Sequence, residues 1–133
     1  MSYVSERKSI ELEFSTSWAT ATPVKWDNVD FEPTAHTSFV SFHIIPSKAV
    51  LKSIGAISSA LYRSYGMIEI QIYTPINQGA AIGASYADRA IDIFRNKRID
   101  DIRCDAGQIQ NIEDVGEWFC TIVTIPFYRD EIT

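Results

Sequence analysis

The stretch from Tyr65 to Phe94, which reads YGMIEIQIYTPINQGAAIGASYADRAIDIF, decides the architecture of this chain. Apolar residues alternate with other residues from Gly66 to Tyr73, which is the pattern of a strand with one buried face. That face carries Ile68, Ile70 and Ile72. Pro75 has no backbone N–H to donate to a sheet, so we expect the strand to end there.

An amphipathic helix is predicted to follow the strand. Asn77 or Gln78 is expected to open it, with Gly79 near its first turn. Apolar residues then recur at spacings of three and four, as they do on the buried side of a helix. The buried stripe is predicted as Ile82, Tyr86, Ala90 and Ile93 or Phe94, and the opposite side as Asp88, Arg89, Asp92 and Arg95. A long strand and a helix that folds back on the sheet therefore form the predicted nucleus.

The 133 residues predict one domain that spans residues 1–133. Apolar residues make up 46% of the chain and charged residues 22%, which is ordinary for a globular protein. The formal charge is −5, and the basic cluster of Arg95, Lys97 and Arg98 is followed directly by Asp100 and Asp101. Specific nucleic-acid binding is therefore disfavoured, although a local patch on an oligomer stays open.

The cysteines and the apolar runs indicate the compartment. Cys104 and Cys120 are too few for a zinc site, and we favour two free thiols over a disulfide between them. No apolar run approaches the length of a membrane span, and residues 1–8 lack the apolar core of a signal peptide. We therefore expect a soluble intracellular protein with no membrane partner.

Residues 3–20 are predicted to form the first helix. Its apolar stripe consists of Tyr3, Ile10, Phe14 and Trp18, which are seven, four and four positions apart. A strand from Ile10 to Phe14 is the alternative, because those residues also alternate strictly. The residues that lead to Pro23 are expected to end the helix.

Two extended segments come next in the chain. Residues 24–28 are predicted as a short strand or an extended arm, and residues 30–36 as a connection. From Thr37 to Ile45 the chain alternates with apolar groups on both faces, which indicates a central strand. Pro46 is expected to stop that strand.

The segment from Ala49 to Leu61 has two interpretations. Its small and β-branched residues favour a hairpin that turns near Gly55, whereas a short helix from Ile57 to Arg63 is the alternative. The segment is longer than a minimal connection, so we regard it as a candidate arm that contacts a neighbouring molecule.

The end of the chain is predicted as a meander of antiparallel strands. These strands span Ile99 to Cys104, Gln108 to Ile112 and Trp118 to Tyr128. Pro126 is expected to place the end of the last strand at a sheet edge or at an exit from the sheet.

The predicted fold class is α+β: an antiparallel or mixed β-sheet with two main helices packed on one face and the three-strand meander at the C-terminus. Helices on one face leave the other face of the sheet open. Its candidate aromatic residues are Phe39, Tyr73, Phe119 and Tyr128. We expect a partner subunit to cover this face, because exposed apolar patches mark interfaces.

A search for reactive groups yields no catalytic, metal-binding or cofactor-binding residue. His43 lies in a predicted strand and His36 in a loop, and neither has a ligand partner at a metal-binding spacing. We interpret His43 as a packed or interface residue and His36 as a solvated one. Asp100 and Asp101 are adjacent, so they would point apart on a strand, and a solvated turn is favoured.

Nucleophile and phosphate motifs are also weak. The serines lack a Gly-x-Ser-x-Gly elbow. The glycine-containing segment 78–83 lacks the Lys-Ser/Thr pair of a phosphate-binding loop, so we interpret Gly79 and Gly83 as residues that let the helix approach its sheet or a neighbouring chain closely. The remaining signal is interaction surface: Tyr62, Arg63 and Tyr65 cluster beside the arm, and tyrosine and arginine are residue types that anchor interfaces.

In this layout the chain resembles the tail terminator, or tail completion, proteins of long-tailed bacteriophages. The most specific part of the resemblance is the run TPVKWDNVDFEP at residues 22–33. The other parts are the N-terminal helix, the strand with Ile44, Ile45 and Pro46, the strand from Tyr65 to Tyr73, the helix from Gly79 to Phe94 and the closing strands. Together these parts extend the resemblance over most of the chain.

The resemblance implies a structural virion protein without enzymatic activity. Such proteins form a hexameric ring at the head-proximal end of the tail tube, stop tube polymerisation and present a surface to the head connector. The implied partners are further copies of the chain, the tail tube protein and the connector protein, and the implied locations are the virion tail and, during assembly, the host cytoplasm. DNA would pass through the lumen without specific binding, which an acidic chain suits.

The resemblance also gives the arm a role. A ring needs a heterologous interface, in which one patch meets a different patch on the next copy. We expect the arm to contact a neighbouring subunit or the tube through Lys52, Tyr62, Arg63 and Tyr65.

Two other classes of function stay open. The first is another connector component, such as a head-closure or tail-tube-like protein. The second is a small enzyme or ligand-binding domain with its site under residues 46–64.

Overall fold

The structure, a computed structural model of the chain, describes residues 2–54 and 60–132. Within these residues the helices are α1 (Tyr3–Trp18) and α2 (Ala81–Phe94). The strands are β1 (Val24–Trp26), β2 (Phe39–Ile54), β3 (Ala60–Pro75), β4 (Arg98–Ile99), β5 (Ile102–Cys104), β6 (Gln108–Val115) and β7 (Trp118–Ile132).

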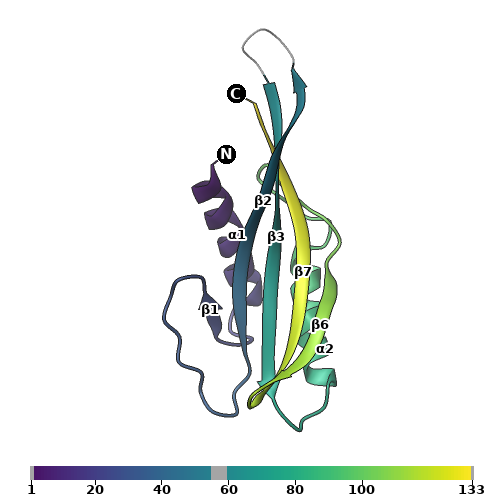
Figure 1. Cartoon of the computed structure of the whole chain (residues 1–133). Helices are drawn as coiled ribbons and strands as arrows, with labels where there is room; N and C mark the ends of the chain where they lie inside the picture. Colours follow the sequence, from purple (N-terminus) through teal and green to yellow (C-terminus); the bar gives the residue numbers. More distant parts are fainter. Residues whose placement is uncertain (1, 55–59, 133) are drawn as a thin grey trace.

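The described strands form one sheet in the order β1-β2-β3-β7-β5-β4, with β6 also paired to β7. β1 runs parallel to β2, and the other described pairs are antiparallel. Figure 1 shows both helices behind the sheet, with β2, β3 and β7 as its long strands. The predicted α+β class, with a mixed sheet and two helices on one face, is confirmed.

The hydrophobic core lies between the helices and one face of the sheet. Ile68, Ile70 and Ile72 are fully buried there, as the alternation along β3 predicts. The sheet register aligns them with apolar residues on both sides; Ile70, for example, pairs with Phe42 of β2 and with Val123 of β7. Because hydrophobic burial is the main favourable term in folding, these aligned rows hold the sheet and the helices together.

α1 confirms the helix interpretation of residues 3–20. Ser2 caps the helix and accepts a hydrogen bond from the Ser5 backbone N–H at 3.2 Å. Ile10, Phe14 and Trp18 are fully buried. The prediction for Tyr3 is wrong, because Tyr3 is 51% exposed and Glu6 occupies the inner side of the first turn. Glu6 is buried because Arg129 of β7 donates to its carboxylate at 2.8 Å.

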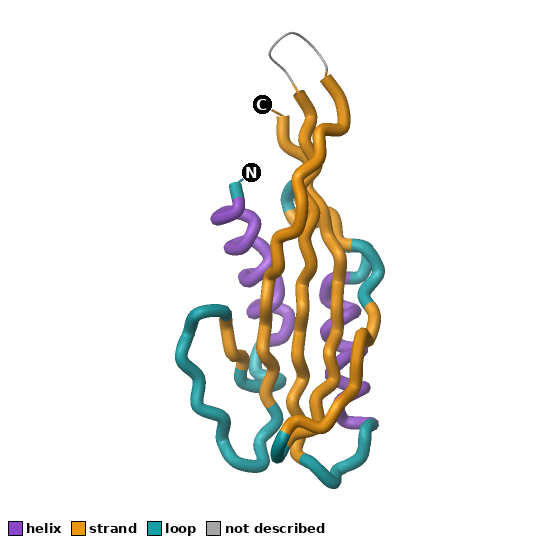
Figure 2. Tube along the Cα trace, viewed as in Figure 1, coloured by secondary structure: helices purple, strands orange, loops and turns teal. Residues whose placement is uncertain are grey.

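β2 and β3 form one long hairpin, which projects past the helices in Figure 2. The favoured hairpin is confirmed up to the pair Ile54–Ala60, and the alternative helix is wrong over Ala60–Arg63, which is strand. The predicted turn near Gly55 falls outside the described residues.

Pro46 does not stop β2, contrary to the prediction. Val40 and Ile44 donate their N–H groups to Pro23 and Asp27, on the side of β2 away from β3. Pro46 has the same parity, so its missing N–H would point to that side, beyond the three residues that pair with β1. A sheet edge tolerates proline there, and a register shift follows between Pro46 and Ala49.

α2 starts later than predicted. Asn77 and Gly79 have positive φ angles, 69° and 78°, so they belong to a loop and the helix begins at Ala81. The stripe is corrected at Ile82, which is 38% exposed, whereas Gly83 is buried. A Cβ atom at Gly83 would lie 2.7 Å from Thr121 Oγ1, which confirms close packing at Gly83. A Cβ atom at Gly79 would meet nothing within 4 Å, so Gly79 does not serve an approach to the sheet, and an approach to a neighbouring chain stays a prediction.

The closing strands differ from a simple meander in their pairing. β5 and β6 both pair with β7, along the same side and one after the other. The predicted strand over residues 99–104 is divided by a turn at Asp100, whose φ is 51°. Pro126 does not end β7. Its carbonyl oxygen accepts a hydrogen bond from the Asp105 backbone N–H, in the gap between β5 and β6. The backbone N and O of one strand residue point to the same side, so the missing N–H of Pro126 also faces that gap.

Candidate functional site

Among the described residues, the sheet face opposite the helices is the main surface that no helix covers, although Phe31 packs on Phe39 at one end of it. The residues of β2, β3 and β7 that face this side include Phe39, Ser41, His43, Met67, Gln71, Tyr73, Ile122 and Tyr128. The predicted placement of Phe39, Tyr73 and Tyr128 on this face is confirmed, and its coverage by a partner subunit stays a prediction. Phe119 is a correction, because it has the parity of the core residues and lies next to Gly83 of α2.

Aromatic rings gather at the β1 end of this open face. Phe39 stacks on Tyr73 with ring centroids 4.7 Å apart, and Phe31 and Trp118 each lie 5.1 Å from Phe39. Burial raises the pKa of Tyr73 to about 12, and its hydroxyl donates to Gln71 Oε1 at 2.7 Å. Phe31 comes from the 22–33 run, which therefore contributes to this face.

Beside these rings the structure forms a hydrogen-bonded chain that sequence reasoning missed. Asp27 Oδ1 lies 2.6 Å from His43 Nδ1, and His43 Nε2 lies 2.6 Å from Ser41 Oγ. The order of groups is that of a serine-hydrolase triad. The i, i+2 spacing of Ser41 and His43 on a strand was a usable signal, whereas Asp27 is 16 residues from His43 and needed the β1–β2 pairing to arrive.

The surroundings of this chain favour a structural role. Ser41 is 3% exposed, at the wall of a cavity of about 530 Å³ that it lines together with His43. By strand parity the N–H groups of Ser41 and His43 point to β3 and serve the ladder, so they are not available to bind an oxyanion. The other oxygen of Asp27 accepts from Arg7 of α1 at 2.9 Å and from the Ile44 N–H at 3.3 Å. Asp27 thus joins α1 to the edge of the sheet.

The arm brings most of the predicted contact residues together on the open face. Arg63 donates to both carboxylate oxygens of Asp130, at 2.8 and 3.0 Å, and its guanidinium lies 4.2 Å from the Tyr128 ring. Lys52 Nζ lies 5.8 Å from the centre of the Tyr65 ring. Hydrogen bonding from Lys52 is the main cause that lowers the pKa of Tyr65, and hydrogen bonding to Arg63 lowers the pKa of Asp130.

Tyr62 lies apart from these residues. It alternates with Arg63 along β3, so it points to the other face of the sheet, where it is 39% exposed. The cavity next to Arg63 has a volume of about 230 Å³ and is lined by charged residues and Tyr128. This is below the usual size of a small-molecule site, roughly 300–1,000 Å³.

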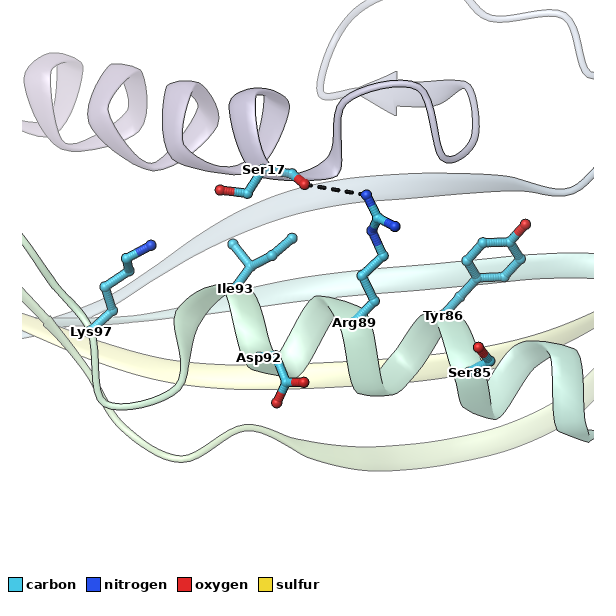
Figure 3. A pocket seen from close by; sticks show the side chains of 7 residues that line it. All are labelled: Ser17, Ser85, Tyr86, Arg89, Asp92, Ile93 and Lys97. Carbon is cyan, nitrogen blue, oxygen red and sulfur yellow. Dashed lines mark hydrogen bonds between the residues drawn. The ribbon is translucent and has the colours of Figure 1, made fainter.

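A groove of about 680 Å³ lies between the two helices (Figure 3). Arg89 reaches across it and donates to the carbonyl oxygens of Ser17 and Trp18, at 3.4 and 3.2 Å. Lys97, at the other end of the groove, forms an ion pair with Glu13 of α1. Both cations thus bind α1, whose last turn has no basic residue of its own, and they hold the helices together.

Other predictions can be compared directly with the described residues. Cys104 and Cys120 are buried and free, so the prediction of two thiols is confirmed. His36 is exposed in a loop, and Asp100 and Asp101 lie in a turn, as predicted. Residues 2–54 and 60–132 contain no cluster of His, Cys, Asp or Glu arranged to hold a metal ion. In the same ranges no helix combines the length and apolar character that a membrane crossing needs.

Comparison with known proteins finds one family that matches most of the chain and a solved structure with a similar fold. A family model described as phage tail terminator protein matches residues 7–127. A solved structure whose title states no function is similar over 92% of this chain and 94% of its own, with a TM-score of 0.65 and 14% sequence identity, and it supports the fold alone. A search of curated proteins finds no match to the sequence.

Proposed function

The chain belongs to the phage tail terminator family, and from this premise we propose that it forms a hexameric ring at the head-proximal end of the tail tube. There it stops tube polymerisation and presents the surface to which the head is joined. The match over residues 7–127 is the observation that carries this proposal, because it covers both helices and most of the sheet. The family is a structural one, so the proposed role needs no reactive group.

The fold supports a role based on contacts. The open face carries half-buried aromatic and polar side chains, and the hairpin of β2 and β3 projects beyond the helices (Figure 1). An isolated hairpin is marginally stable, but β7 pairs with β3 as far as Leu61–Ile132 and stiffens the arm as a third strand. A stiff projection suits contact with a second molecule, through Lys52, Tyr62, Arg63 and Tyr65.

The remaining parts of the proposal concern the assembly. Copies of this chain, the tail tube protein and the head connector protein are the proposed partners. Phage DNA passes through the lumen of the ring, and the net charge of −5 disfavours its retention. The protein is a component of the virion tail and assembles in the host cytoplasm.

Electron microscopy of phage particles tests this function. We expect virions that lack the chain to carry tails of irregular length that do not join heads, and expression of the wild-type chain in trans to restore both properties. Expression in trans of a Lys8→Glu variant, which changes one exposed residue of α1, is the control for a single surface substitution, and we expect it to restore both properties as the wild type does. Normal tail length and head attachment without the chain would refute the proposal.

A further inference from the structure

Five of the twelve lysine and arginine residues gather at the base of the arm. We call this set the basic arm-base patch: Lys48, Lys52, Arg63, Arg98 and Arg103. They come from four strands that are far apart in sequence. The overall charge of the chain is negative, so their gathering on one side of the sheet is a feature of the fold and not of the composition.

The sheet register places the patch on the open face. Arg98 of β4 pairs with Arg103 of β5, which pairs with Tyr128 of β7, which pairs with Tyr65 of β3. Residues that pair directly across a sheet share one face, so these side chains form a row. Lys48 completes the row from β2, with its ammonium 5.8 Å from the centre of the Tyr65 ring.

Among the described residues, four of these five cations have no carboxylate within 4 Å, although Lys52 and Arg103 act on Asp130 at longer range. Elsewhere Arg7, Arg95, Lys97 and Arg129 each lie within 4 Å of a carboxylate. Within the patch, and among the described residues, only Arg63 has such an ion pair, with Asp130. Lys48, Lys52, Arg98 and Arg103 are exposed. Binding a partner with exposed carboxylates would therefore supply ion pairs that the single chain does not.

Matching carboxylates lie at the opposite end of the sheet. Glu113, Asp114 and Glu117 surround the turn between β6 and β7, and we call them the acidic tip. All three are exposed and have no ion pair within the described part of the chain. β7 runs from Trp118 beside this turn to Tyr128 in the patch, ten residues later, or about 33 Å along the strand. The two regions are therefore too far apart to meet within one molecule.

We propose that the basic arm-base patch of one copy binds the acidic tip of a second copy. The inference rests on the proposed ring, whose interface has to join two different patches, as a heterologous contact does. Arginine guanidinium groups match carboxylates in geometry, and Tyr65 and Tyr128 supply the aromatic anchors typical of interfaces. Charge complementarity between the two ends selects a second copy as the occupant.

Duplex DNA is the less favoured occupant. Asp130 and Asp101 lie beside the patch and lower its positive charge toward any anion, which weighs most against the dense charge of a duplex. A phosphate-tracking surface needs a denser row of cations than this one. Discrete carboxylates on a protein surface fit a mixed patch better.

Charge reversal with rescue tests the contact in the purified full chain. Arg103→Glu alone and Glu113→Arg alone are each expected to raise the concentration needed for self-association by about tenfold or more, as measured by sedimentation. The double variant, with both changes, is expected to return toward the wild-type value. Lys8→Glu changes an exposed lysine outside the patch and is expected to have no effect. Circular dichroism checks that each variant is folded.

A disulfide experiment reports the contact directly. Chains with Lys52→Cys are mixed with chains that carry Glu117→Cys, and cross-linked dimers are expected in the mixture and not in either preparation alone; the native cysteines are buried. Rings that form without this cross-link and ignore both reversals would overturn this inference while leaving the proposed function intact. A chain that stays monomeric at every concentration, both alone and with purified tail tubes, would overturn both. Duplex DNA binding that is lost with Arg103→Glu, without any effect on self-association, would assign the patch to DNA instead.

Discussion

Removal of the Glu6 carboxylate is expected to be among the most destabilising single changes in this chain. Glu6 and Arg129 join α1 to β7, and their side chains are only 4% and 2% exposed. Arg129 Nε donates to Glu6 Oε1 at 2.8 Å. Burial alone would lower the pKa of Arg129, but hydrogen bonds to Glu6 and Glu131 raise it overall, so the guanidinium stays charged. Glu6→Ala therefore leaves a buried cation with part of its neutralisation missing.

The magnitude follows from the partners that remain. Breaking a buried ion pair from one side costs about 3–5 kcal/mol. Glu131 still lies 3.2 Å from Arg129 and the Tyr3 ring 5.0 Å from it, so we expect the lower end, about 3 kcal/mol of unfolding free energy. Replacing both charges by apolar residues, Glu6→Leu with Arg129→Met, is expected to recover most of that loss, because it removes the uncompensated charge.

Urea denaturation followed by circular dichroism measures these differences. Glu11→Ala is the matched control on the same helix, because Glu11 pairs with Arg7 at 3.8 Å in a partly exposed setting and is worth about 0.5 kcal/mol or less. The reasoning would be refuted if Glu6→Ala cost no more than Glu11→Ala. It would also be refuted if the apolar double variant were less stable than the single one.

Three further predictions concern the helix contact, the Asp27 network and the thiols. Gly83→Ala is expected to destabilise the chain by about 1–3 kcal/mol, because the new Cβ would lie 2.7 Å from Thr121 Oγ1, even though alanine is the better helix former. Adding Thr121→Ala should recover part of the lost stability. A single variant that is more stable than wild type in thermal melts would contradict the close packing. Burial would raise the pKa of Asp27, but hydrogen bonds from His43, Arg7 and Ile44 lower it overall, so its contribution is complete above the unfolded value of 3.8 and is lost as pH falls through the lower folded value. The stability difference between wild type and Asp27→Asn, about 1–3 kcal/mol near neutral pH, should therefore shrink below pH 4 in urea titrations, and a difference that is constant from pH 7 to pH 3 would exclude this role. Burial raises the pKa of Cys104 to about 12 and that of Cys120 to about 11, from a usual 9.0. Iodoacetamide should therefore alkylate the folded chain roughly 100-fold or more slowly than the urea-unfolded chain, as followed by mass spectrometry. Similar alkylation rates in the two states would contradict this prediction.

Local patterns predicted the elements well where burial and periodicity agreed. The three isoleucines of β3 and the stripe of Ile10, Phe14 and Trp18 are fully buried because each pattern reports one face of one element. Patterns failed where a distant partner changed the rule. Glu6 is buried because it pairs with Arg129. The two residues are 123 positions apart in sequence, so no local signal contains that pairing.

The proline rule failed for a related reason. A proline ends a strand only when its missing N–H faces a neighbouring strand. At Pro46 it faces an open edge, and at Pro126 it faces the gap between β5 and β6. Which side a residue faces depends on strand order, and strand order was not available from the sequence. The same limit hid the Asp27–His43–Ser41 chain, whereas the contact role of Arg63 and Tyr65 rests on residue type alone and stays a prediction.

The position of β7 has a consequence for the order of events during synthesis. β7 is the last of the described strands, yet it lies between β3 on one side and β5 and β6 on the other. Until it leaves the ribosome, β3 and β6 each lack a neighbour, and the stiffened arm cannot exist. Such long-range pairing makes folding slow and late. A chain that lacks β7 therefore cannot present the stiffened arm or complete the open face.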